Sequence, residues 1–151
     1  MELLNRIEEL EKELLELKEQ VKGQQEFPQS GERYWYNNGG GMVNSCFWKS
    51  EQFDLNRYRI GNMFKTEKEA EFAVEKLKVE EELRKFSRPF EYGKFNHYLF
   101  LDIDGDSFRT DVTSYCPPQG AIYFESEEKV QQAIKSVGED RIKKYIFGVE
   151  D

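Results

Sequence analysis

One segment of the chain occurs twice, sixty residues apart, and this repeat constrains the fold more than any other feature. Residues 64–75 read FKTEKEAEFAVE and residues 124–135 read FESEEKVQQAIK, so Phe, Glu and Ala recur at equivalent places. In each copy an aromatic residue precedes a hydroxyl residue, Thr66 or Ser126, which is followed by acids. Hydroxyl residues cap helix N-termini, and acids are favoured in the first helical turn. The repeat therefore predicts two units, each with strands followed by one capped helix.

In the first unit, aromatic and β-branched residues surround a glycine-rich loop. Strands are expected at 33–36 and 42–49, because Asn-Gly between such segments is a strong hairpin signal. A third, short strand is expected at 58–60, ahead of a helix from about 66 to 86. The helix should end there because Ser-Arg-Pro follows, and Pro does not continue a helix.

The second unit is expected to follow the same order. Strands are predicted at 98–103 and 107–112 around an Asp-Gly turn, with a junction strand at 121–124. The second helix should span about 127–137, before a glycine. After a short helical turn, residues 145–147 are expected to form either another strand or a packed tail.

These elements predict an α+β protein in which an N-terminal helix precedes two tandem strand-strand-strand-helix units with antiparallel sheets. The predicted organisation is a coiled-coil helix at 1–22, a linker at 23–31, a first unit at 32–90 and a second unit at 91–151. Gly and Pro in the linker break the helix. A chain of 151 residues holds one ordinary domain, so we expect the two units to pack together as one.

The first 22 residues carry an apolar heptad pattern. Spacings of four and three alternate, which places apolar residues at the a and d positions of a coiled coil. The predicted oligomerisation residues are Leu3, Ile7, Leu10, Leu14, Leu17 and Val21. Three heptads are marginal alone, so the helix should need the rest of the protein to hold the assembly. The pattern predicts that the protein binds itself, as a dimer or a higher oligomer.

Charges beside the heptad favour a parallel, in-register pair of helices. Arg6 at position g can face Glu11 at position e of the partner helix, and Glu13 can face Lys18 in the same way. Ile and Val at a with Leu at d favour two strands, although Leu14 at a weakens that preference. The alternative is an amphipathic helix that lies on its own domain.

The predicted helix at 66–86 carries two apolar stripes. The first stripe contains Ala70, Ala73, Val74 and Leu77. The second stripe, which we interpret as an interface, contains Phe72, Val79, Leu83 and Phe86. Two stripes on one helix indicate contact with two surfaces, such as its own sheet and a partner subunit.

Charge and cysteine content exclude several classes of function. The net charge of −8 argues against general nucleic-acid binding, which usually shows a basic surface. Cys46 and Cys116 stand far apart and His97 is the only histidine, so no metal site and no cofactor are expected. The cysteines are expected as free thiols, although they could pair if the two units face each other. No membrane-spanning run and no signal peptide are recognisable, so a cytoplasmic location is expected.

The stretch from Asp102 to Gly105, an apolar strand ending in Asp-x-Asp-Gly, is the most suggestive catalytic motif. It resembles the first motif of the haloacid-dehalogenase-like phosphatases, in which the first Asp attacks phosphorus and the second acts as acid and base. That family continues with Thr, where this chain has Asp106, and it needs a large downstream domain, whereas 45 residues remain. An Asp-Gly hairpin turn explains the same residues. We therefore expect the protein not to be an enzyme.

Rings and guanidinium groups on or beside the strands form a candidate ligand site. Aromatic faces stack on nucleobases and Arg binds phosphates, so these residues could line a small-nucleotide pocket. The candidate ligand-binding residues are Trp35, Trp48, Arg57, Arg59 and Arg109. The alternative is that the rings belong to the core and the Arg side chains cover them.

Residues 57–67, which read RYRIGNMFKTE, resemble small proteins encoded in phages and prophages of Gram-positive bacteria, as does the ending GEDRIKKY at 138–145. The resemblance spans most of residues 32–147 and carries no catalytic set. Many such genes are accessory, meaning dispensable for building the virion, and some accessory phage proteins of this size inhibit host defence. The resemblance therefore implies an accessory protein that acts in the host bacterial cell.

We expect a non-enzymatic, self-associating phage accessory protein that counters host antiphage defence by binding. It would block an effector protein or sequester a nucleotide signal. An acidic inhibitor would bind a basic effector with an affinity that falls as salt rises, whereas a nucleotide sponge would be stabilised by its ligand. The alternative is a structural or regulatory phage component that docks a partner through its coiled coil.

Overall fold

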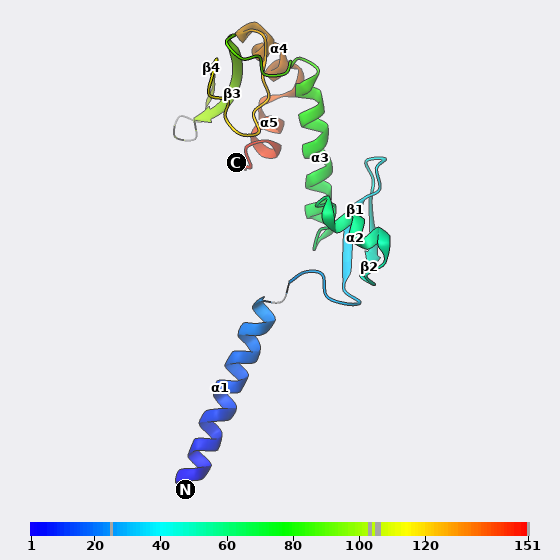
Figure 1. Ribbon diagram of the computed structural model, residues 1–151, viewed down its shortest axis with the longest axis vertical. Coiled ribbons are helices and arrows are strands. Elements are labelled where there is room, and N and C mark those ends of the chain that lie inside the picture. The colour runs from blue at the N-terminus through cyan, green and yellow to red at the C-terminus, as the bar shows by residue number, and fades with distance from the viewer. Residues whose placement is uncertain (25, 103, 105–106, 151) are drawn as a thin grey trace. The chain divides into compact units, whose positions relative to one another are not determined.

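The protein is a mixed α/β chain with two compact units (Figure 1). Unit 1 is Met1–Ala70 and unit 2 is Glu71–Asp151, so the boundary lies inside a helix, whereas the sequence analysis divides the repeats near residue 90. The computed structural model describes residues 1–24, 26–102, 104 and 107–150. Within these ranges each unit contains one antiparallel two-stranded sheet.

Helix α1 spans Glu2–Gln24 and precedes the first sheet. Glu, Leu and Lys dominate it, and these residues are strong helix formers. The helix includes Gly23, so it runs two residues past the predicted bound at residue 22. The side chains from Glu2 to Val21 are exposed, and the apolar stripe of α1 is therefore open to solvent. Its pairing with a second helix stays a prediction.

The hairpin of unit 1 pairs β1 (Arg33–Asn37) with β2 (Val43–Phe47) in antiparallel register, as predicted. Asn38 shapes the loop, because its Oδ1 accepts a backbone N–H two residues further on at 2.8 Å. Phe64 forms a single bridge on the other side of β1, with backbone hydrogen bonds to Trp35 of 2.9 and 3.0 Å. The junction before the next helix thus contributes one bridge rather than a strand.

Residues 58–60 do not form the predicted strand, because helix α2 runs through Gln52–Arg59. The prediction relied on Tyr and Ile, which favour strands. The helix forms because Asp54 accepts the backbone N–H of Glu51 at 3.2 Å in its first turn and is itself fully buried. Contacts with the hairpin therefore override the local strand propensity.

Both copies of the repeated segment begin a helix with the predicted cap. The Thr66 hydroxyl accepts a backbone N–H at 3.2 Å ahead of α3 (Glu67–Arg84). Ser126 accepts the equivalent N–H at 3.2 Å ahead of α4 (Glu127–Val137). The two helices therefore begin where the sequence analysis places them. The two copies differ in what precedes the helix, since α2 replaces a predicted strand in the first copy.

The hairpin of unit 2 pairs β3 (Asn96–Asp102) with β4 (Ser107–Thr113), again antiparallel. Phe124 bridges the other side of β3 through backbone hydrogen bonds with His97 of 2.8 and 3.0 Å. The predicted junction strand at 121–124 is therefore reduced to isolated bridges. A bridge still fixes the start of α4 against the hairpin, two residues before its Ser126 cap.

The core of unit 2 is formed by α3, α4 and α5 (Glu139–Tyr145), with Phe124 between hairpin and helices. Its buried members are Val79, Leu83, Phe124, Val130, Ala133, Ile134, Val137 and Ile142. The segment 145–147 packs against this core and forms no strand. The packed-tail alternative is therefore the correct one.

Candidate functional site

Six apolar side chains of α1 form a stripe that we call the seam: Leu3, Ile7, Leu10, Leu14, Leu17 and Val21. All of them are exposed, from 48 % for Leu10 to 81 % for Leu3. In the single chain, Arg6 beside the seam forms an ion pair within its own helix, with Glu9 at 2.9 Å. A continuous exposed apolar stripe marks an interaction surface. The seam is therefore the first candidate site of the protein.

Arg57, a predicted ligand residue, is engaged by neighbours in its own unit. Its Nη1 donates a hydrogen bond of 2.8 Å to the Tyr34 hydroxyl. Its guanidinium carbon lies 3.5 Å from the ring centroid of Tyr36 and 5.0 Å from that of Phe53. Such contacts between a cation and aromatic faces are stabilising. The guanidinium group, a candidate phosphate ligand, thus serves to hold α2 on the hairpin, as the alternative interpretation of these residues has it.

Tyr34 and Asp54 form a polar contact beneath Arg57, and we call these three residues the clamp. Both Tyr34 and Asp54 are fully buried, and the Tyr34 hydroxyl donates to Asp54 Oδ1. The other carboxylate oxygen accepts the backbone N–H groups of Lys49 at 3.0 Å and Glu51 at 3.2 Å. Both carboxylate oxygens therefore accept hydrogen bonds from donors in unit 1, and the clamp joins β1 to the start of α2.

The pKa values of the clamp fix its protonation. Burial, and then the hydrogen bond to Asp54, raises the pKa of the Tyr34 hydroxyl well above its ordinary value. Burial alone would raise the pKa of Asp54, but the hydrogen bonds from Tyr34 and from the backbone of Lys49 and Glu51 outweigh it and lower that pKa. A neutral phenol therefore faces a carboxylate at neutral pH. This arrangement stabilises the fold and offers no group poised to exchange a proton with a substrate.

The Asp54→Asn variant should lose less stability in acid than the native protein. Because the pKa of Asp54 is lower in the folded state, its carboxylate stabilises the fold above about pH 4, and this contribution is lost as the pH falls through the folded-state pKa. At neutral pH the variant should be the less stable protein, and the gap should close in acid. Urea unfolding at stepped pH measures this through Trp35 and Trp48, the two tryptophans, which both lie in unit 1. If the difference in stability between the variant and the native protein does not change with pH, the lowered pKa of Asp54 is contradicted.

The two tryptophans lie in different surroundings. The Trp48 ring packs edge-on against the clamp, with its centroid 6.5 Å from that of Tyr34 and 6.2 Å from that of Tyr58. Trp35 follows Tyr34 on β1 and so faces the opposite side of the sheet, where the guanidinium carbon of Arg33 lies 4.8 Å from its ring. The two rings therefore do not line one pocket.

The remaining predicted ligand residues are also separate. Arg59 is exposed in the last turn of α2. Arg109 belongs to unit 2, where its guanidinium pairs with Asp102 at 3.1 Å. The structure thus brings Arg57 and Trp48 together around Tyr34 but does not gather all five residues in one unit. Sequence reasoning missed Tyr34 and Asp54, which are twenty residues apart, because no local pattern links them.

The second apolar stripe of α3, interpreted above as an interface, packs on its own unit. Val79 and Leu83 are buried in the core of unit 2, and Phe86 packs against that core. The ring centroid of Phe72 lies 5.0 Å from that of Tyr145. The first stripe is buried at Ala70 and Val74 but leaves Leu77 exposed. The stripe was misread because the sequence shows that a face is apolar but not which neighbour covers it.

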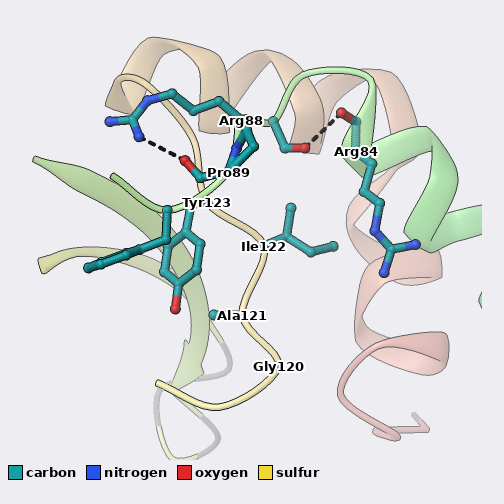
Figure 2. A pocket seen from close by; sticks show the side chains of 9 residues that line it. Arg84, Arg88, Pro89, Gly120, Ala121, Ile122 and Tyr123 are labelled. Atoms are coloured by element: carbon teal, nitrogen blue, oxygen red, sulfur yellow. Dashed lines mark hydrogen bonds between the residues drawn. The ribbon is translucent and has the colours of Figure 1, made fainter. Parts of the chain in front are cut away.

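A cavity of about 510 Å³ lies in unit 2, where the segment after α3 meets the segment before α4 (Figure 2). Figure 2 shows the side chains of Arg84 and Arg88 pointing away from each other, so they do not converge on one anion. Arg88 is engaged elsewhere, since it donates to the carbonyl of Phe95 and to Oδ1 of Asn96, each at 2.7 Å. Ligand sites combine an apolar wall with convergent polar groups. Because its two guanidinium groups diverge, this cavity is a weak ligand site.

Both the oxygen and the nitrogen of the Asn96 side-chain amide make hydrogen bonds at the start of β3. Its side chain is buried, and Oδ1 accepts from Arg88 and from the backbone N–H of Glu91 at 2.9 Å. Its Nδ2 lies 2.9 Å from the carbonyl oxygens of Glu91, Lys94 and Thr113. One side chain therefore sets the path of the loop that leads into the hairpin.

The Asp-x-Asp-Gly stretch is only partly described by the structure. Asp102 lies on β3 and pairs with Arg109, and Asp104 is exposed. The other residues of that stretch, Ile103, Gly105 and Asp106, lie outside the described residues.

The other chemistry-bearing residues remain apart. Cys46 is half-buried and Cys116 is exposed, and both are free thiols. Across the described part of the chain, His, Cys, Asp and Glu side chains form no group of three that could hold a metal ion. In the same ranges every helix is too short or too polar to cross a membrane.

The chain has no match among the protein-family models, the curated proteins and the solved structures with which it was compared. Its function is therefore inferred from the exposed seam, the engaged clamp and the distribution of charge.

Proposed function

We propose that the protein is a non-enzymatic, self-associating phage accessory protein that counters host antiphage defence by binding and blocking an effector protein. The observation that supports this most strongly is the exposed seam of α1. Its heptad spacing suits a second copy of the same helix, and pairing would remove six apolar side chains per chain from water. Self-association would then present two or more copies of each compact unit to the target.

A protein target fits the described contacts better than a nucleotide. Arg57 and Arg109, which are candidate phosphate ligands, are already engaged by Tyr34 and Asp102. The net charge of −8 also opposes binding of an anionic ligand and favours a basic protein surface. We therefore place the blocking of an effector protein ahead of the sequestration of a nucleotide signal.

A structural or regulatory phage component is the second candidate. Leu4 and Leu15 lie outside the seam, and each is 62 % exposed. They widen the apolar surface of α1 beyond what a symmetric pair of helices needs. A different phage protein with a complementary helix would use this wider surface.

Capture from phage-infected bacteria tests the proposed function. Tagged native protein should recover a host protein that is released as the salt concentration rises, because the contact is between opposite charges. The recovered protein is then purified, and its activity should fall when the captured complex is rebuilt. A panel of cyclic and linear nucleotides should leave the melting temperature unchanged.

Three outcomes would contradict this proposal. Stabilisation by a nucleotide would support the nucleotide sponge instead. Recovery of a phage structural protein that depends on α1 would support the second candidate. An effector whose activity is unchanged by the bound protein would exclude blocking as the mechanism.

A further inference from the structure

The outer edge of β4 exposes backbone groups that no described strand uses. Figure 1 shows β4 as the outer strand of its hairpin, on the side away from α4. His97 exchanges backbone hydrogen bonds with Phe124, so its N–H and C=O point away from β4. Facing residues of an antiparallel pair share this orientation, and Val112 faces His97. The N–H and C=O groups of Val112, Thr110 and Phe108 therefore point outward.

The sequence of β4 is complementary to itself in the antiparallel direction. It reads SFRTDVT, with Thr110 at its centre. A second copy laid antiparallel about Thr110 would match Phe108 with Val112, Arg109 with Asp111, and Ser107 with Thr113. Apolar residues would meet apolar residues, each cation would meet an anion, and hydroxyl groups would meet hydroxyl groups. Facing pairs of these kinds stabilise a sheet.

The phase of the backbone agrees with the same register. Thr110 has outward-pointing N–H and C=O groups, so two copies centred on it would exchange both hydrogen bonds directly. The next outward residues on either side, Phe108 and Val112, would meet each other and do the same. A centre at Arg109 or Asp111 would also pair outward residues with outward residues, but it would place two like charges opposite each other across the axis. The hydrogen-bond phase therefore permits the register centred on Thr110, and the side-chain pattern selects it.

We propose that β4 pairs with β4 of a second copy of this chain, antiparallel and about a two-fold axis at Thr110. In one chain Asp111 Oδ1 accepts the N–H of Val112 at 2.8 Å, and Arg109 pairs with Asp102 at 3.1 Å. On pairing, the Val112 N–H binds the facing carbonyl, and Asp111 turns to the facing Arg109. Because a two-fold axis relates the two copies, the interface is isologous, and each residue contributes to it twice.

This second surface does not depend on α1. An edge-to-edge contact between short strands is weak alone. Association through α1 would strengthen it by raising the effective concentration of β4 edges. The experiment therefore examines β4 both with an intact seam and with a disrupted one, so that failure of one surface is distinguished from failure of the other.

Disulfide trapping in the full-length chain tests the register. In a chain with Cys46→Ser and Cys116→Ser, Thr110→Cys should form covalent dimers at least about tenfold faster than Ser107→Cys. The reason is that residues facing themselves across the axis have Cα atoms about 5.5 Å apart, within disulfide range. Ser107 faces Thr113 in this register and lies far from its own copy. Equal rates for the two variants would overturn the proposal.

Sedimentation of the full-length chain with a disrupted seam, Leu10→Asp with Leu17→Asp, tests the contact without α1. Its mean mass should rise with concentration towards that of two chains. Adding Thr110→Pro should abolish the rise, because Pro removes an outward N–H that the hairpin itself does not use. Thr110→Val keeps that N–H and should preserve the rise. A mass that stays at one chain at every concentration, or a rise that survives Thr110→Pro, would refute the pairing.

Charge exchange separates pairing from folding. Arg109→Asp alone and Asp111→Arg alone each place like charges opposite one another across the axis and should weaken association. The double exchange restores opposite charges at both positions and should recover it. If the double variant associates no better than either single variant while its circular dichroism is unchanged, the facing of Arg109 and Asp111 is refuted.

Discussion

The variant with Leu10→Asp and Leu17→Asp should sediment at low micromolar concentration with the mass of one chain, 18.0 kDa, while the native protein sediments as a dimer or larger. Both leucines lie at d positions of the seam and are exposed in the single chain. Burial of each leucine contributes about 1.5–3 kcal/mol, so a dimer that loses four of them should dissociate at least about ten-thousandfold more readily. Analytical ultracentrifugation measures the difference directly.

Leu15→Asp is the matched control for this prediction. It makes the same change on the same helix, but Leu15 lies at position b, outside the seam, and is 62 % exposed. Its mass should equal that of the native protein. If the native protein itself has the mass of one chain, or if the seam variant keeps the native mass, the coiled-coil prediction is wrong.

Asp54→Ala should lower the free energy of unfolding of unit 1 by about 3 kcal/mol or more, since it leaves the buried Tyr34 hydroxyl and two backbone N–H groups without their acceptor. Tyr34→Phe removes one donor to the carboxylate and should cost about 1.5–3 kcal/mol. A unit of this size has little stability to spare. Urea unfolding followed by tryptophan fluorescence reports on it, because Trp35 and Trp48 both lie in unit 1.

Tyr58→Phe is the matched control for the clamp. It removes the same hydroxyl group from a ring that also contacts Trp48, but Tyr58 is 52 % exposed. Its effect should stay within about 0.5 kcal/mol, as for most surface substitutions. The double variant with Tyr34→Phe and Asp54→Ala should be less destabilised than the sum of the single changes, because both remove the same contact. Simple additivity would mean that the two residues do not act together.

The parts of the fold that could be predicted from the sequence are those set by neighbouring residues. The caps at Thr66 and Ser126 use a backbone N–H three residues on, so the sequence pattern contains the whole interaction. The hairpin at 33–47 was predictable for the same reason, because Asn and Gly in its loop determine the turn. The starts of α3 and α4 and the two hairpins were therefore placed correctly.

The parts that could not be predicted depend on contacts between distant residues. Helix α2 forms where Tyr and Ile favour a strand, because Asp54 is held by Tyr34 from a different element. The aromatic partners of Arg57 could not be identified for the same reason, since they come from both β1 and α2. The second stripe of α3 is covered within its own unit rather than by a partner subunit, because the segment at 145–147, sixty residues further on, packs against the same core. Pattern alone identifies such residues but not their roles.

The amide of Asn96 has a consequence for sequence tolerance. Its bonds to the backbone at Glu91 and Lys94 set the path of the loop at 91–95, whose side chains are exposed. Asp at this position would lose the N–H donors, and Ala would lose both the donors and the accepting oxygen. Gln would place the amide one methylene too far from the backbone. In a saturation-mutagenesis screen for folded protein, position 96 should therefore accept Asn alone, while its exposed neighbours accept many residues. The shape of this loop is specified by a residue outside it, which leaves the surface of the loop free to diversify.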